Sequence, residues 1–119
     1  MFWKKKEDGN AFPWEDLQEV GQLEDIIELS KEKPVLIFKH STRCSISFMA
    51  KSRFEGGYED MGMSIWLLDL IKNRSISNQI AEDFGIKHES PQVLLIKEGK
   101  CIYSASHNAI EFRSVKQNL

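Results

Sequence analysis

The chain has 119 residues, of which 41% are hydrophobic and 29% charged, a composition typical of one globular domain with a modest core. Its formal net charge of -2 argues against a basic surface for nucleic acid or anionic membranes. No stretch reaches the roughly 20 apolar residues of a membrane-spanning helix, and the first residues lack the apolar core of a secretory signal. Two cysteines in such a chain favour a reducing, cytoplasmic location.

The first half of the chain predicts a helix, a buried strand and a second helix. Residues 1–13 are polar and are expected to form a lead-in, followed by a single domain over residues 14–119. Apolar residues at helical spacing predict a first helix, and the uninterrupted apolar run 35–38 predicts a strand buried on both faces. The second helix is expected to start near Cys44 and to end at a pair of glycines. Its predicted apolar stripe consists of Ile46, Met49, Ala50 and Phe54.

The second half predicts a strand, a helix, a hairpin and a last helix. Residues 65–71 predict a second buried strand, and apolar residues four apart over 76–84 predict a helix that a glycine ends. Two more strands are expected after Pro91, joined by a tight turn at Glu98–Gly99. Asn108 has the features of a capping residue and is expected to start the last helix.

The predicted order is helix, strand, helix, strand, helix, strand, strand, helix. A right-handed crossover makes the first two strands parallel, and the last two strands form an antiparallel hairpin. This is the element order of the thioredoxin fold. We therefore predict an α/β protein with a thioredoxin-like, central four-stranded mixed sheet flanked by helices and preceded by an N-terminal extension.

Two segments resemble known families within this fold. Residues 81–99, which include Ser90–Pro91, are similar to the region around the cis-proline of thioredoxins. The run Lys39–Ser47, KHSTRCSIS, more specifically resembles the YtxJ-like family, the monothiol bacilliredoxins. The resemblance extends from Trp14 to the end of the chain. One departure is Ser45, which stands where many bacilliredoxin motifs have a proline after the cysteine.

The resemblance implies a cytosolic thiol–disulfide oxidoreductase that removes bacillithiol, a low-molecular-weight thiol, from mixed disulfides on proteins. Bacillithiolated cytosolic proteins are the implied partners, and bacillithiol is the implied cosubstrate, with no tightly bound cofactor. Cys44 is the expected nucleophile. The sequence has no CxxC or HxxxH spacing, so no metal site is predicted.

The position expected for Cys44 fits the chemistry, because only a thiolate attacks a disulfide sulfur. At a helix N-terminus, unpaired N–H groups and the macrodipole favour negative charge, so we expect a lowered pKa for this thiol. Lys39 and Arg43 add positive charge nearby in sequence. Ser47 lies one helical turn later, where its hydroxyl can donate to the thiolate but cannot resolve a mixed disulfide. The sequence therefore predicts a monothiol cycle.

Substrate contacts are expected from three segments around the cysteine. The expected residues are Lys39, Thr42, Arg43, Ser90, Pro91, His107 and Asn108. Ser90–Pro91 would align the incoming disulfide, and the start of the last helix would offer donors to the carboxylates of bacillithiol. Alternatives remain at three positions: Lys39 exposed to solvent, Asn108 acting only as a cap, and His40 either tuning Cys44 or only satisfied at a strand end.

Cys101 is not expected to act as a second redox cysteine. The predicted hairpin places it about 15–20 Å from the nucleophile, beyond the reach of a disulfide, so a buried structural thiol is expected. Two other functions remain open. One keeps the mechanism but uses glutathione or coenzyme A as the thiol, and the other is a thioredoxin-like binding module whose cysteine has no redox turnover.

Overall fold

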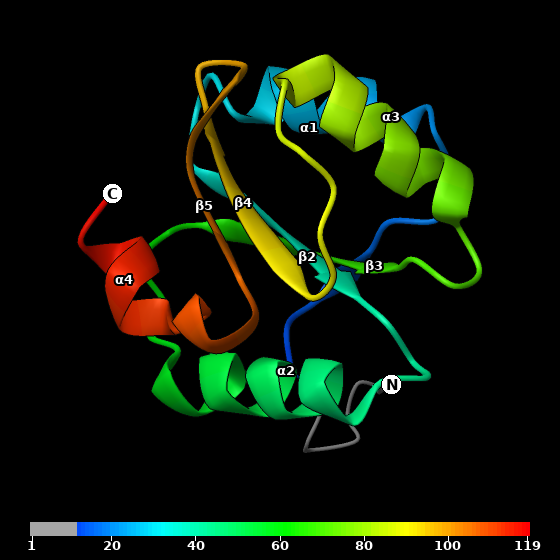
Figure 1. The fold of residues 1–119 in the computed structure, drawn as a ribbon. Helices are drawn as coiled ribbons and strands as arrows, with labels where there is room; N and C mark the ends of the chain where they lie inside the picture. Colours follow the sequence, from blue (N-terminus) through cyan, green and yellow to red (C-terminus); the bar gives the residue numbers. More distant parts are fainter. Residues whose placement is uncertain (1–11) are drawn as a thin grey trace, which may run out of the picture.

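The sheet of the computed structural model has five strands in the order β1-β3-β2-β4-β5, and the structure describes residues 12–119 (Figure 1). The strands are β1 (Glu15–Asp16), β2 (Val35–His40), β3 (Ser64–Asp69), β4 (Gln92–Lys97) and β5 (Lys100–Ser106). Strands β1, β2 and β3 are parallel, whereas β4 is antiparallel to both β2 and β5. The predicted mixed sheet is confirmed, but its strand count is wrong by one because the two-residue β1 pairs with β3.

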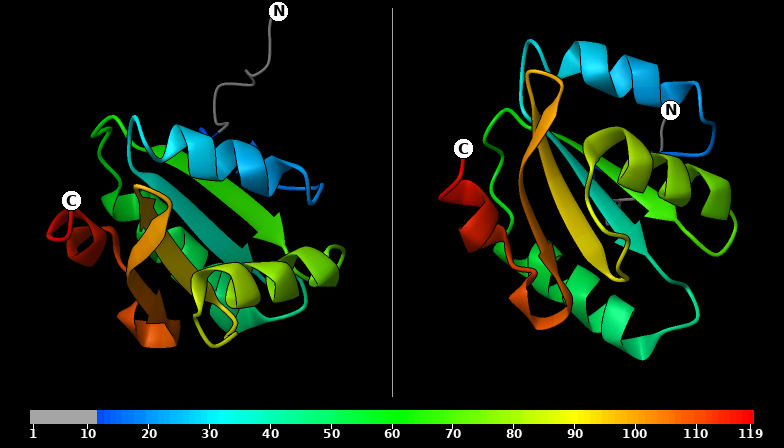
Figure 2. Two further views of the ribbon diagram at one scale, coloured as in Figure 1. Left: turned by 90° about the horizontal axis from the view of Figure 1, so that it is seen from above. Right: turned by 45° about the horizontal axis from the view of Figure 1, so that its top comes forward.

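Helices cover both faces of the sheet. Helices α1 (Gln22–Leu29) and α3 (Arg74–Phe84) lie on one face, and α2 (Ser45–Gly57) and α4 (Phe112–Lys116) lie on the other (Figures 1 and 2). A short 3-10 turn, η1 (His107–Ala109), joins β5 to α4. Each face of the sheet therefore has its own apolar core. Within the described chain, no helix is both long and apolar enough to cross a bilayer.

Strand β2 is buried along its whole length because helices cover both of its faces. Leu36 and Phe38 belong to the core on the α2 side, and Ile37 belongs to the core on the α1 side. The last two residues continue this alternation. Lys39 reaches α3 and His40 reaches α2 through side-chain hydrogen bonds. The strand that precedes Cys44 thus ends in two buried polar side chains on opposite faces of the sheet.

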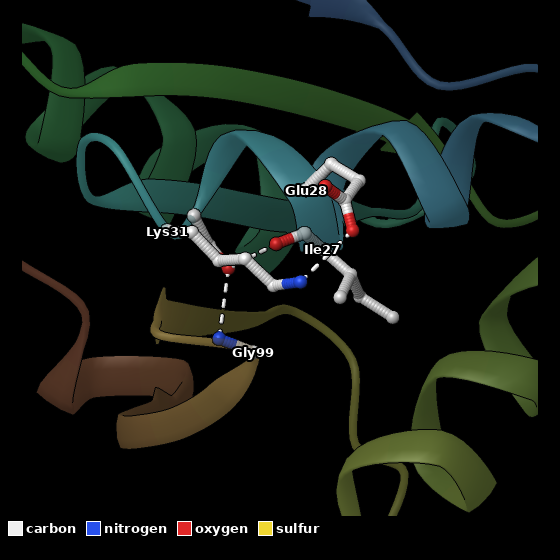
Figure 3. A network of polar contacts seen from close by, with 5 residues as sticks. Ile27, Glu28, Lys31 and Gly99 are labelled. Atoms are coloured by element: carbon white, nitrogen blue, oxygen red, sulfur yellow. Dashed lines mark hydrogen bonds and ion pairs between the residues drawn. The ribbon is translucent and has the colours of Figure 1, made fainter.

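The end of the sheet opposite to Cys44 is fixed by contacts between the end of α1 and the β4–β5 turn. The Ser30 hydroxyl donates to the carbonyl oxygen of Ile27 (2.6 Å) and accepts from the N–H of Gly99 (2.9 Å). Figure 3 labels Ile27 and Gly99, the two residues that this serine connects. The Glu98 N–H donates to the Ser30 carbonyl (2.9 Å). Glu98 and Gly99 have φ values of 52° and 76°, as a two-residue hairpin turn requires. The turn predicted at these residues is confirmed.

The predicted apolar stripe of α2 is only half correct. Ala50 and Phe54 are buried, but 52% of Ile46 and 64% of Met49 are exposed to solvent. The inward position of the first turn belongs to Ser47, which is fully buried. Because the inward residue is a serine, the apolar pattern of the sequence assigned the buried side of this turn to Ile46 and Met49 instead.

The chain after β5 also differs from the prediction. His107 opens the 3-10 turn with a φ of 55°, and α4 starts later, with Glu111 as its N-cap in extended backbone. The expected helix start at Asn108 is therefore wrong. At the other boundary of the domain, Phe12 packs its ring 5.0 Å from that of Tyr58. Residues 1–11 of the predicted lead-in lie outside the described residues, and the division into lead-in and domain stays a prediction.

Candidate active site

Cys44 lies between the end of β2 and the start of α2, as predicted. It is the N-cap residue of α2, with extended backbone angles of -127° and 119°. Its carbonyl accepts the N–H of Phe48 (3.2 Å), and its own N–H donates to the carbonyl of Ser41 (3.3 Å). The residue is half-buried and carries a free thiol. The sulfur therefore sits at the helix end where backbone N–H groups lack helical partners and the macrodipole is positive.

Ser47 holds the loop that carries Cys44. Its hydroxyl oxygen accepts the N–H of Ser41 (2.9 Å) and lies 2.7 Å from His40 Nδ1. These contacts join the first turn of α2 to the end of β2 across the loop. Among the described residues, the Ser47 hydroxyl makes no hydrogen bond to the Cys44 sulfur, so the expected donation to the thiolate stays a prediction.

His40 is buried, with 4% of its surface exposed. Its ring meets Phe48 edge to face with 4.6 Å between the ring centres. Burial lowers the pKa of His40 below its ordinary value; the Lys51 charge lowers it further, and the Asp69 and Glu55 carboxylates act in the opposite direction. The imidazole is therefore neutral near pH 7, and its Nδ1 can accept a hydrogen bond from the Ser47 hydroxyl or donate one to it, depending on the tautomer.

Lys39 is not placed to contact a ligand, contrary to the prediction. The residue is fully buried, and its ammonium donates to the carbonyl of Ser77 (3.2 Å) and to His88 Nδ1 (3.3 Å). Burial, with a smaller effect of the Arg74 charge, lowers the pKa of Lys39 to about 8. A solvent-exposed amine, the alternative that the sequence left open, is also wrong, because α3 and the loop before β4 cover this end of β2.

The loop before β4 carries Ser90 and Pro91. The Ser90–Pro91 peptide bond is cis, Pro91 is buried and Ser90 is half-buried. The carbonyl of Pro91 accepts the N–H of His107 (3.1 Å). Gln92, the first residue of β4, donates through Nε2 to the carbonyl of Lys87 (3.0 Å). The loop is thus held from both β4 and η1.

His107 and Asn108 do not form the expected start of a helix. Both side chains are exposed, and both residues lie in the three-residue η1 turn that precedes α4. The His107 N–H is already used by Pro91, and the His107 carbonyl accepts from Arg53 (3.0 Å). A ring nitrogen of His107 lies 3.9 Å from the Glu89 carboxylate. The His107 N–H is therefore not free for a bacillithiol carboxylate, and the ligand contacts expected of His107 and Asn108 stay a prediction.

Thr42 and Arg43 are exposed on the loop just before Cys44. Thr42 lines a cavity of about 230 Å³ together with His40 and Asp69. The backbone N–H of Arg43 lies 3.4 Å from the Ser41 hydroxyl, to which it donates. Of the positively charged residues expected around the cysteine, Arg43 is the one whose side chain is open to solvent.

Cys101 is far from the nucleophile. It lies in the sheet row of Val35, at the start of β2, whereas Cys44 follows His40 at the other end of that strand. Five residues of strand at about 3.3 Å each span roughly 16 Å, too far for a disulfide. The thiol is half-buried and donates to the carbonyl of Tyr103 (3.4 Å); burial raises its pKa above the ordinary value.

A group of exposed apolar side chains follows Cys44 in the first two turns of α2. Ile46 and Phe48 are 52% and 51% exposed, and Met49 is 64% exposed. Ile46 and Met49 are three positions apart and share one side of the helix, and exposed apolar surface often marks a place where another molecule binds. We call these three residues the apolar patch.

A family model described as monothiol bacilliredoxin BrxC matches residues 15–115, which is most of the chain. The chain belongs to the monothiol bacilliredoxin family. The match includes the run Lys39–Ser47 and the loop at Ser90–Pro91, so it covers both segments that carried the resemblance in the sequence. Thiol oxidoreduction is the activity that this family and fold indicate.

Solved structures confirm the thioredoxin fold of this bacilliredoxin. A candidate oxidoreductase with a thioredoxin fold is 30% identical, with a TM-score of 0.79 over 89% of this chain and 93% of the other. Thioredoxin from Trypanosoma brucei brucei is 15% identical, with a TM-score of 0.71 over 92% and 91% of the two chains. Thioredoxin from Fasciola hepatica is 14% identical, with a TM-score of 0.66 over 86% and 92%. The two thioredoxins share the fold alone.

Sequence reasoning missed three residues at the site of this bacilliredoxin. Ser77 and His88 bind the Lys39 ammonium, and Gln92 holds the loop before Pro91. None of them lies in the motif around Cys44. The one hint for Ser77 and His88 is the charged residue at the end of an otherwise apolar strand, because a lysine buried there would require polar partners. That hint does not show where in the chain the partners lie.

Proposed function

We propose that the protein removes bacillithiol from mixed disulfides on cytosolic proteins, with Cys44 as the nucleophile. The observation that carries this proposal is the place of Cys44: a free, half-buried thiol at the N-cap of α2 in a member of the monothiol bacilliredoxin family. Backbone N–H groups at that position favour the thiolate. The second cysteine of the chain, Cys101, is too distant to take part.

The proposed cycle has two exchange steps. In the first, the Cys44 thiolate attacks the bacillithiol sulfur of a protein mixed disulfide. The new bond joins Cys44 to bacillithiol, the old disulfide bond breaks, and the substrate protein leaves as a thiolate that takes a proton from water. In the second, a thiolate of another low-molecular-weight thiol attacks the bacillithiol sulfur on Cys44. A small disulfide leaves, and Cys44 returns as a thiolate.

Neighbouring residues support these steps in different ways. Ser47 and His40 fix the loop of Cys44 by the hydrogen bonds described above, and this fixes the direction from which the sulfur attacks. Ser90–Pro91 aligns the incoming disulfide by backbone contact. Arg43, open to solvent beside the cysteine, is suited to a carboxylate of bacillithiol.

The apolar patch supports a protein, rather than a free small disulfide, as the substrate. Its side chains lose contact with water when an apolar segment of another protein covers them. We expect Met49→Glu to slow the reaction with a protein mixed disulfide about tenfold and to leave the reaction with oxidised bacillithiol unchanged. Val20→Glu is the matched control, because Val20 is 57% exposed and lies just before α1, on the other face of the sheet. Equal slowing with both disulfides would contradict this assignment.

The direct test mixes the reduced protein with a bacillithiolated protein and follows the mass of the reduced chain. We expect one bacillithiol adduct, located on Cys44, together with release of the substrate protein. Cys101→Ser should give the same adduct, and Cys44→Ser should give none. If no adduct forms, or if Cys44→Ser forms it equally well, the proposal is wrong.

The same assay separates the two other functions that the sequence left open. Mixed disulfides of glutathione and coenzyme A compete with that of bacillithiol, and the thiol with the highest second-order rate is the physiological one. A pure binding module is indicated if Cys44 reacts with iodoacetamide with the pH dependence of an ordinary cysteine and transfers none of these thiols.

A further inference from the structure

Lys39 is a buried charged group that the proposed cycle does not use. Its side chain is fully buried on the α3 face of the sheet, while α2 and its first turn lie on the opposite face. Its ammonium contacts the carbonyl of Ser77 and the ring of His88, neither of which carries a negative charge. Burying an ammonium without a carboxylate is costly, so a residue of this kind is rarely present for stability alone.

Through His88, Lys39 is bonded to the loop that carries Ser90 and Pro91. An ammonium can only donate, so His88 Nδ1 must be the unprotonated acceptor. The Ser77 hydroxyl donates to the same nitrogen (3.0 Å). His88 is therefore fixed from β2 through Lys39 and from α3 through Ser77.

Gln92 completes the attachment of this loop. It lies directly opposite Lys39 in the paired strands β2 and β4, and its Nε2 donates to the carbonyl of Lys87 (3.0 Å). Two residues of the segment before Ser90, Lys87 and His88, are thus both bonded to side chains of the sheet. These two contacts fix the path of the chain that leads to Pro91.

We propose that Lys39 and His88 are positioning residues for substrate binding: they hold the Lys87–Pro91 loop in the place from which it aligns the disulfide opposite Cys44. This inference rests on the proposed function. The loop is correctly placed only while His88 Nδ1 is unprotonated and accepts from Lys39.

Protonation of His88 should release the loop. A proton on Nδ1 turns the acceptor into a donor that faces the Lys39 ammonium. Burial and then the charges of Lys39 and Arg74 lower the pKa of His88 below its ordinary value, and the Glu89 carboxylate acts against them. Arg74 of α3 and Glu89 of the loop are the other charged groups that act on this pair. The loop therefore stays in place near pH 7 and is released only at a pH below the ordinary pKa of a histidine.

The test compares two reactions of the same sulfur. The rate with a bacillithiol mixed disulfide is divided by the rate with iodoacetamide, a reagent that does not need alignment by the Lys87–Pro91 loop. Both reactions depend on the Cys44 thiolate, so the ratio is independent of the ionisation of that thiol and reports the alignment of the disulfide.

Lys39→Met keeps the volume and removes the donor, and we expect it to lower the ratio about tenfold, because a displacement of about 1 Å can cost as much as ~100-fold. The control, Lys33→Met, removes the same charge from an exposed position before the other end of β2 and should leave the ratio unchanged. His88→Phe should act like Lys39→Met. His88→Asn supplies an acceptor that does not titrate, so it should keep the ratio at pH 7 and abolish its fall at acid pH.

Hydrogen exchange at the amide that is bonded to the loop is measured on the same proteins and requires no activity. We expect faster exchange at His107, whose N–H donates to the carbonyl of Pro91, in Lys39→Met and His88→Phe, with the rest of the sheet unchanged. An unchanged ratio in Lys39→Met overturns the inference, because the lysine would then be only structural. If the unmodified protein exchanges no disulfide at all, the proposed function fails, and unchanged hydrogen exchange in Lys39→Met then overturns the positioning of the loop as well.

Discussion

Replacement of Lys39 by methionine should make the protein more stable near neutral pH. The pKa of Lys39 is about 8 in the folded protein, against an ordinary value of 10.5. Between these two values the unfolded chain binds more protons than the folded one, so the free energy of unfolding rises with pH across that window. Below pH 8 the folded protein carries the full cost of the buried charge, and above pH 10.5 the cost is absent.

The size of the effect follows from the same two values. At about 1.4 kcal/mol per pKa unit, the cost of the buried ammonium is about 3 kcal/mol at pH 7. No correction for solvent screening applies, because the residue is fully buried. Loss of the hydrogen bonds to Ser77 and His88 offsets about 1 kcal/mol. We therefore expect Lys39→Met to be about 2 kcal/mol more stable at pH 7 and slightly less stable above pH 10.5.

Urea unfolding, followed by tryptophan fluorescence in the presence of a reductant, measures this difference at pH 7.5, 9 and 10.5. Other groups titrate in this range, but they are common to both proteins and cancel in the comparison. Lys33→Met, which removes an exposed charge, should show no pH-dependent difference from the unmodified protein. A difference between Lys39→Met and the unmodified protein that stays constant over the three pH values would refute the reasoning.

Three further predictions concern α2 and α3. Ser47→Ala leaves the buried N–H of Ser41 and the Nδ1 of His40 without their partner, and urea unfolding should show a loss of about 1–3 kcal/mol. Ser47→Cys places a second thiol one turn after Cys44, as in redox-active CxxC motifs; thiol counting should show an intramolecular disulfide, and a stable bacillithiol adduct would contradict this. Gly85 has a φ of 66° and free space where a Cβ would lie, so Gly85→Ala should cost about 1 kcal/mol of backbone strain, measured as a fall in Tm of about 4 °C.

The fold could be predicted because its main elements carry clear patterns. The apolar run 35–38 indicates a strand covered on both sides. The glycines that end α2 and the glycine that follows α3 mark helix ends that the structure confirms. The pair Glu15–Asp16 has no such pattern. Its pairing with β3 is set by the position of the neighbouring strand, so a two-residue edge strand cannot be read from local sequence.

The candidate site was predicted at its centre but not in its surroundings. The sequence places Cys44 at a helix start, because a buried strand ends shortly before it and a helical pattern follows. It cannot show that Lys39 is buried, since the residues that cover it, Ser77 and His88, are 38 and 49 positions away. A serine also gives no sign in the sequence that it faces inward, and this hid the contact between Ser47 and His40.

Lys39 and His40 are consecutive in β2 and therefore point to opposite faces of the sheet. His40 is bonded to the first turn of α2, which holds Cys44, whereas Lys39 is bonded to His88 in the loop that leads to Pro91. In the proposed reaction, the sulfur and the segment that aligns the disulfide are thus both fixed to the end of one strand. A shift of α2 alone would disturb only the contact of His40, and a shift of α3 alone would disturb only the contacts of Lys39. The separation between the nucleophile and the aligning loop is therefore determined by the most buried strand of the sheet, which is the element least able to move.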